Sequence, residues 1–234
     1  MTLISGLMLA ALVLLRLDLG LGMVALSAPF YLHPRALMGK AFSMAEILTL
    51  LCLASWSVRQ FKQRDRILRT AWSPSWADRI VLLLVVAAGA STLFAERRHV
   101  ALRELRVTIL EPALFYAMVR TTDLTHNGGR WWIVDGLVAG GAVVAVIGLA
   151  QYALDVNVIT AEGGFRRLRS VYGSPNNAAL YLGRVLPPLL AVAVVGRARR
   201  RRILYGLLVV PVGLAILLSF SRAAILLGVP CALL

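Results

Sequence analysis

Residues 131–154, WWIVDGLVAGGAVVAVIGLAQYAL, decide the fold class of this chain. Asp135 is the only charged residue in the stretch, which is long enough to cross a bilayer because a membrane helix needs roughly 17–25 residues. Of the 234 residues, 59% are hydrophobic and 15% are charged, whereas soluble domains have about 45–50% apolar and about 25% charged residues. The composition therefore predicts a membrane protein and excludes a disordered chain.

Further apolar runs lie on both sides of this stretch. They cover residues 1–15, 19–32, 42–58, 77–95, 107–119, 178–195, 203–220 and 223–234. Arg16 and Asp18 separate the first two, which are either two short helices or one broken crossing. The last run is too short to span, which predicts an N-terminal fragment that ends inside a helix. We expect an all-α, polytopic bundle of roughly eight to nine hydrophobic segments, with residues 1–234 forming one incomplete transmembrane domain.

The net charge of +14 comes from basic clusters between the apolar runs. This arrangement is typical of membrane topology and contact with membrane lipids, and we expect no nucleic-acid partner. The Lys/Arg bias places residues 59–69 and 197–202 on the cytoplasmic side of a multi-pass protein. Residues 96–106, 155–177 and 221–222 then face outward. The outer loops are also basic, and an anionic ligand would explain why they break the rule.

Other sequence signals are weak. Gly136, Gly140 and Gly141 form a small-residue pattern that predicts close helix packing. The cysteines, Cys52 and Cys231, lie in apolar runs and do not indicate a disulfide framework. The histidines show no metal-ligand spacing, and no nucleotide-binding glycine pattern occurs. We therefore expect no metal and no cofactor.

The strongest candidate site is GGFRRLRSVYGSPNN, residues 163–177. Arg166, Arg167 and Arg169 precede a turn that runs from Gly173 through Pro175 to the asparagines Asn176 and Asn177. We expect Asn176 or Asn177 to cap the following helix, whose N-terminus carries free N–H groups and partial positive charge. Together with the arginines, this predicts an outward-facing anion site. The alternative is a basic loop beside a capped helix.

Two more arginines extend this prediction. Arg184 lies seven residues after Asn177, on the same helix face and two turns into the membrane, where a charge is costly. It either contacts a ligand or forms a buried pair with Glu46 or Glu111. Arg222, in Ser221-Arg222-Ala223, is a second basic element on the outer side.

At these two motifs the sequence resembles the O-antigen ligase and polymerase family of bacterial membrane proteins. An arginine before Gly173-Ser174-Pro175-Asn176, and Ser221-Arg222-Ala223 further on, are similar to the elements of that family in order and spacing. Phe42-Ser43-x-x-Glu46 and Leu110-Glu111-Pro112 are similar as well. The resemblance implies a C-type glycosyltransferase-like membrane fold in the bacterial cytoplasmic (inner) membrane.

The resemblance also implies an activity. It is transfer of a glycan from an undecaprenyl-pyrophosphate carrier to a lipid or glycan acceptor at the outer face, without metal or cofactor. Arg167, Arg169 and Arg222 would be catalytic through stabilisation of the leaving pyrophosphate. The expected substrate-binding residues are Arg166, Gly173, Pro175, Asn176, Asn177 and Arg184. The family has a large outer loop after the Ser-Arg element that carries an arginine and a histidine, so this fragment alone is expected to be inactive.

Two other functions stay open. A secondary transporter or flippase for an anionic lipid or solute could use Glu46, Glu111 and Arg184 as a coupling path. A structural membrane subunit would have no site of its own.

Overall fold

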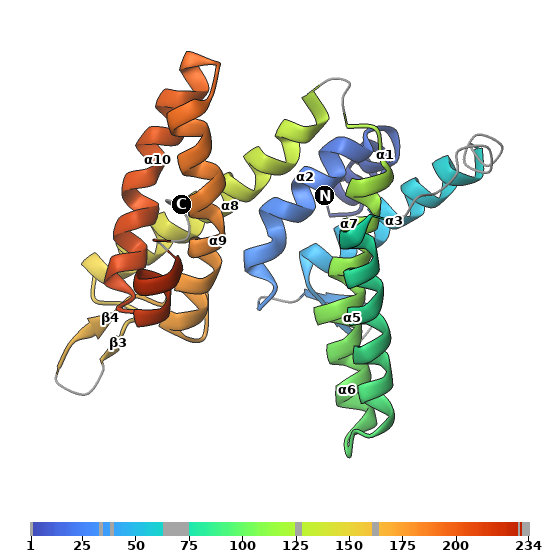
Figure 1. Ribbon diagram of the computed structural model, residues 1–234, viewed down its shortest axis with the longest axis horizontal. Coiled ribbons are helices and arrows are strands. Elements are labelled where there is room, and N and C mark those ends of the chain that lie inside the picture. Colours follow the sequence, from blue (N-terminus) through green and yellow to red (C-terminus); the bar gives the residue numbers. More distant parts are fainter. Residues whose placement is uncertain are drawn as a thin grey trace. The chain divides into compact units, whose positions relative to one another are not determined.

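The computed structural model describes residues 2–32, 35–37, 40–62, 75–124, 128–160, 164–228 and 230. Their contacts divide the chain into two compact units. The first unit joins Met1–Leu21 with Glu46–Arg130, and the second joins Gly22–Ala45 with Trp131–Leu234. Most of the described chain is helical (Figure 1). The described residues do not include Arg64, Arg66 and Arg69 of the basic stretch 59–69, or Cys231.

Four helices are long and apolar enough to cross a membrane. They are α5 (Trp76–Leu93), α8 (Gly129–Ala153), α9 (Pro175–Val195) and α10 (Arg199–Leu218). This confirms the all-α class in its coarse form and agrees with a membrane protein. The larger number of segments expected from the sequence is not confirmed.

The N-terminal segment forms two short helices, α1 (Thr2–Leu15) and α2 (Leu17–Ser27), followed by the 3-10 helix η1 (Ala28–Phe30). Arg16 lies at the break and donates to both carboxylate oxygens of Asp18, at 3.0 and 2.7 Å. The sequence left two short helices or one broken crossing open, and the structure has two helices. In the first unit, α3 (Met44–Lys62) contributes Cys52, a buried free thiol.

The first unit also contains a helical hairpin. After α5 and a short turn, the chain continues through α6 (Arg98–Glu104), the π-helix η2 (Leu105–Leu110) and α7 (Glu111–Thr121). The expectation that 96–106 is a loop is therefore wrong, because most of that stretch is helical, and its outward orientation stays a prediction. The π turn precedes Pro112, and the N–H of Glu111 bonds to the oxygen of Arg106. A wider turn accommodates a proline ring that would clash with an α-helical carbonyl.

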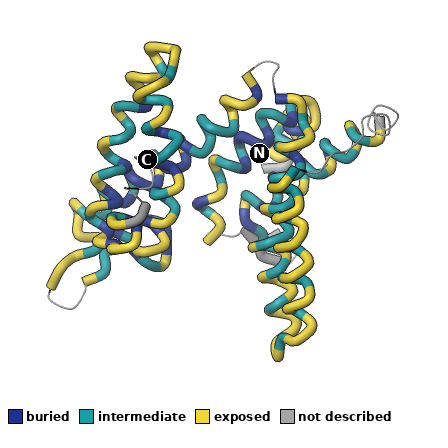
Figure 2. Tube along the Cα trace, in the orientation of Figure 1, coloured by how far each residue is buried: buried dark blue, intermediate teal, exposed yellow. Residues whose placement is uncertain are grey.

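Helix α5 has no buried residue, and its large apolar side chains are exposed over most of its length (Figure 2). Leu82, Leu83 and Val86 are 63%, 69% and 59% exposed. An apolar helix surface of this kind suits a lipid environment.

The second unit has its core where α8, α9 and α10 meet, around buried residues such as Val144, Leu182, Val185 and Ile216. Helix α8 also meets α2 closely. A Cβ atom added to Gly136 would lie 2.2 Å from the carbonyl oxygen of Gly22. The close helix packing predicted from the glycine pattern is therefore confirmed at Gly136.

Two small antiparallel hairpins and a second π-helix complete the described chain. The hairpins pair β1 (Arg35–Leu37) with β2 (Lys40–Phe42), and β3 (Ile159–Thr160) with β4 (Arg166–Arg167). The π-helix η4 (Ala224–Gly228) follows α10. No pattern in the sequence predicts these elements.

Candidate functional site

The segment between β4 and α9, residues 168–174, is built into the second unit; we refer to it as the polar turn. Leu168 and Ser170 are each 1% exposed. The Ser170 hydroxyl donates to the carbonyl oxygen of Val144 in α8 at 2.7 Å, and the Leu168 N–H donates to the oxygen of Leu218 at the end of α10 at 2.9 Å. Ser170 has a φ of 53°, which is unusual for a residue other than glycine. The polar turn is therefore held between α8 and α10.

Arg167 joins the two sequence motifs. Its Nε atom donates to the carbonyl oxygen of Ser219 at 2.9 Å, and its Nη2 atom donates to Asn176 Oδ1 at 3.0 Å. Nη2 also lies 3.4 Å from the oxygen of Phe220. A guanidinium at the carboxyl end of α10 satisfies carbonyls that the helix leaves unpaired and complements its negative dipole end. Arg167 therefore brings the start of α9 and the end of α10 together.

Arg166 and Arg169 bind the segment that leads into the β3–β4 hairpin. Arg169 donates from Nε to the backbone oxygen of Asn157 at 3.1 Å, and from Nη2 to the Asn157 side chain. Arg166 pairs with Asp155 at 2.9 Å, and its guanidinium lies 5.1 Å from the centre of the Tyr152 ring. The hydrogen bond with Asp155 raises the pKa of Arg166. Arg166, in β4, and Arg169, in the polar turn, therefore bind residues just ahead of β3 and share no partner with Arg167.

The cap of α9 differs from the prediction. Ser174, rather than Asn176 or Asn177, is the N-cap residue, and its hydroxyl accepts from the N–H of Asn177 at 3.3 Å. Pro175 occupies the first helical turn, where its fixed φ and missing N–H fit well. The expectation of an asparagine cap is wrong because Ser174 takes that position, and the Asn176 side chain is left to accept from Arg167. Gly173 has no atom within 4 Å of an added Cβ.

Arg184 and Arg222 are exposed, and neither has a hydrogen bond or ion pair within the described part of the chain. Glu46 and Glu111, considered as partners of Arg184, belong to the first unit and Arg184 to the second, so that pairing stays a prediction. The Glu46 and Glu111 carboxylates lie beside Arg106 of the same unit, at 2.6 and 3.8 Å. Arg184 and Arg222 are therefore the predicted site arginines whose charges are available to a ligand.

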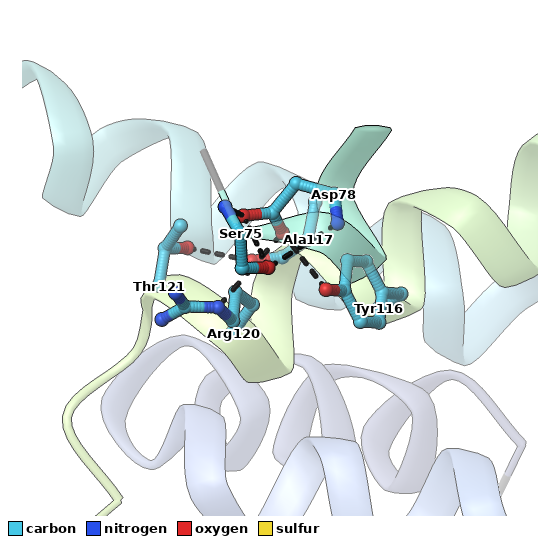
Figure 3. Close-up of polar contacts among 6 residues, drawn as sticks. All are labelled: Ser75, Asp78, Tyr116, Ala117, Arg120 and Thr121. Atoms are coloured by element: carbon cyan, nitrogen blue, oxygen red, sulfur yellow. Dashed lines mark hydrogen bonds and ion pairs between the residues drawn. The ribbon is translucent and has the colours of Figure 1, made fainter. Parts of the chain in front are cut away.

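The first unit contains a polar cluster that is absent from the predicted site residues (Figure 3). Ser75 caps α5 through reciprocal bonds with Asp78, and the Tyr116 hydroxyl of α7 donates to Asp78 Oδ1 at 2.8 Å. Arg120 Nε lies 3.8 Å from the same oxygen. The spacing Ser75-x-x-Asp78 is a capping-box signal that could have found the first two residues. No sequence signal connects them to Tyr116, which lies 38 residues away.

A second unpredicted contact joins the first two turns of α8 to the first two turns of α10. Arg201 pairs with Asp135 at 2.7 Å and lies over the Trp131 ring at 4.1 Å. The Tyr205 hydroxyl donates to the other oxygen of Asp135. Arg197, Arg199, Arg200 and Arg202 around this contact are exposed. Asp135 therefore fixes one arginine of this basic stretch.

The fold defines a mostly helical protein with four candidate membrane-spanning helices. Its polar contacts hold a basic segment where the start of α9 meets the end of α10. Comparison of the chain with protein-family models, curated proteins and solved structures identified no match. Within the described residues, no group of three or more His, Cys, Asp and Glu side chains could hold a metal ion.

Proposed function

We propose that this chain carries the donor side of a membrane glycosyltransferase of the O-antigen ligase or polymerase type. The reaction is transfer of a glycan from an undecaprenyl-pyrophosphate carrier to a lipid or glycan acceptor at the outer face of the bacterial cytoplasmic membrane. The observation that carries the proposal is the pair of bonds from Arg167 to Asn176 and Ser219. They place the Gly173–Asn177 and Ser219–Arg222 motifs, far apart in sequence, at one location.

The arginines have different roles in this proposal. Arg222 meets the pyrophosphate, because its side chain is exposed and unpaired within the described part. Arg167 and Arg169 position the site, because their guanidinium groups bind backbone and amide oxygens of the chain. Negative charge develops on the pyrophosphate as the sugar leaves, and fixed cations at that point lower the barrier.

The remaining features of the proposal concern the whole protein. We propose that the protein forms a C-type glycosyltransferase-like bundle. In this bundle the short helices α1 and α2 and the π-helix η4 are parts of further membrane segments. The polar turn and Arg222 face outward, and Arg197–Arg202 face the cytoplasm, following the Lys/Arg bias of membrane proteins.

The test is glycan transfer by membranes that contain the whole protein, from a labelled undecaprenyl-pyrophosphate donor. We expect Arg222→Ala to reduce transfer by at least about a hundredfold, as for loss of one group that stabilises developing charge. Arg200→Ala is the matched control, because Arg200 is also exposed and unpaired within the described residues but belongs to the other basic cluster. Equal transfer by both variants would contradict the proposal.

A transporter or flippase is the second candidate. The placement of Glu46 and Glu111 beside Arg106 favours it, because grouped ionisable residues in membrane helices often carry protons or ions. Movement of a labelled anionic lipid across proteoliposomes under a proton gradient tests this function. Glu111→Gln is expected to abolish the dependence on the gradient if the transporter hypothesis is correct.

A further inference from the structure

Three tyrosines of the second unit, Tyr31, Tyr172 and Tyr181, form a cluster with Tyr172 of the polar turn at its centre. The Tyr172 and Tyr181 ring centres are 5.9 Å apart, and those of Tyr172 and Tyr31 are 6.3 Å apart. The three residues come from separate segments: the end of η1, the polar turn and α9. Tyr172 is 7% exposed and Tyr31 is 44% exposed. The cluster therefore runs from the interior of the unit to its surface.

The hydroxyl groups at the centre of this cluster lack acceptors. The Tyr181 hydroxyl is buried and has no hydrogen-bond partner. A Cβ atom added to Gly140 would lie 2.9 Å from the Tyr181 oxygen, so this hydroxyl lies against α8. The Tyr172 hydroxyl makes no hydrogen bond within the described residues either. Native proteins rarely leave a buried hydroxyl without a partner, so the Tyr181 hydroxyl needs an explanation.

Arg184 adds positive charge beside these hydroxyls. It follows Tyr181 by three residues, which places both on one side of α9. Burial raises the pKa of Tyr172, and the positive charge of Arg184 opposes that rise. Arg184 is exposed and unpaired within the described part. The cluster therefore offers hydrogen-bond donors and a cation, and its described contacts include no carboxylate.

We propose that Tyr172, Tyr181 and Arg184 bind the phosphate oxygens of a lipid-linked pyrophosphate. A phosphate offers only acceptors, which is the complement of what this cluster presents. The ligand's identity as the pyrophosphate of a polyprenyl-linked glycan rests on the proposed function. Arg184 is exposed on a candidate membrane helix, so a lipid carrier reaches the cluster sideways from the bilayer. Tyr181 and Tyr172 then donate to oxygens that the chain itself does not supply.

The experiment measures binding of undecaprenyl pyrophosphate to the full chain in nanodiscs of neutral phosphatidylcholine. We expect Tyr181→Phe and Arg184→Gln each to weaken binding at least about tenfold, because a hydrogen bond to a charged group is worth about 1.5–3 kcal/mol. The unfolding temperature of Tyr181→Phe should stay level or rise, since the hydroxyl has no partner to lose. A structural role would lower that temperature instead. Tyr152→Phe and Arg200→Gln are controls that should bind like wild type.

The outcomes separate this inference from the proposed function. Unchanged binding in Tyr181→Phe and Arg184→Gln, together with weaker binding in Arg222→Ala, overturns the tyrosine site and leaves the proposed donor site in place. No binding by the wild-type chain overturns both. Inorganic pyrophosphate and phosphatidylglycerol are the competing probes. If either displaces the lipid pyrophosphate at equal concentration, the assignment to a lipid-linked pyrophosphate is wrong.

Discussion

Arg167 Nε donates a hydrogen bond of 2.9 Å to the backbone oxygen of Ser219, 52 residues later in the chain. Ser219 is fully buried, and its own hydroxyl donates back to the oxygen of Ile216. The arginine thus ends α10 by binding a carbonyl that has no helical partner. One side chain links the conformation of the polar turn to that of the segment that carries Arg222.

Replacement of Arg167 is expected to destabilise the second unit. Arg167→Ala removes bonds to Ser219 and Asn176 and should lower the free energy of unfolding by about 1–3 kcal/mol. Arg166→Ala is the control, because its ion pair with Asp155 is exposed to solvent and contributes little to stability. Denaturant titration in detergent micelles measures both. Equal stability of the two variants would show that Arg167 does not hold this junction.

Gly136 is expected to tolerate no side chain. Gly136→Ala places a methyl group within 2.2 Å of the Gly22 oxygen, so α2 and α8 must separate. Overpacking of this kind costs about 1–3 kcal/mol. Gly183→Ala is the matched control, because no atom lies within 4 Å of its added Cβ. Thermal unfolding should show a lower midpoint for Gly136→Ala and an unchanged or higher one for Gly183→Ala.

The Tyr116 hydroxyl is expected to stabilise the hairpin of α5 and α7. Tyr116→Phe removes its bond to the Asp78 carboxylate and should destabilise the hairpin, because a hydrogen bond to a charged group stabilises more than one between neutral groups. Proteolysis of the detergent-solubilised protein, followed at the turn at 94–97, measures opening of the hairpin. Tyr152→Phe should be cleaved like wild type. Cleavage of Tyr116→Phe at the wild-type rate would remove the support for this contact.

The topology prediction places Gly164 outside the cell membrane and Ala198 in the cytoplasm. Alkaline phosphatase fused after Gly164 should therefore be active, and the same enzyme fused after Ala198 should be inactive, because it folds only outside the cytoplasm. A green fluorescent reporter at the same positions should give the opposite pattern. An inactive phosphatase after Gly164 would overturn both the topology and an outward-facing donor site.

The sequence could predict where the long helices lie. The apolar run 131–154 coincides with α8, and 178–195 falls within α9, because length and hydrophobicity specify a membrane helix almost alone. Helix α10 begins at Arg199, ahead of its apolar run, because arginine is a strong helix former. The grouping of Arg167 with Asn176 also follows from their short separation in sequence.

The remaining contacts depend on distant residues. Tyr116 meets Asp78, and Tyr205 meets Asp135, only after separate helices have packed, and neither pair leaves a periodic signal. The sequence does not decide between serine and asparagine as the cap of α9, because both residue types cap helices well. The cap is Ser174 because Pro175 takes the first helical position. The π turn before Pro112 also depends on how neighbouring turns absorb the proline.

The bond from Ser170 to Val144 decides where this chain can change in length. Val144 precedes the end of α8 by roughly 13 Å along the helix axis, at 1.5 Å per residue. A residue inserted between Leu168 and Ser170 would displace an anchor at that depth, so we expect an engineered insertion there to disrupt the second unit. Gly164 is different, because its backbone is left-handed, with φ 80°, and no atom lies within 4 Å of an added Cβ. Affinity tags and length variation therefore belong at Gly164, although both positions lie in one connection between α8 and α9.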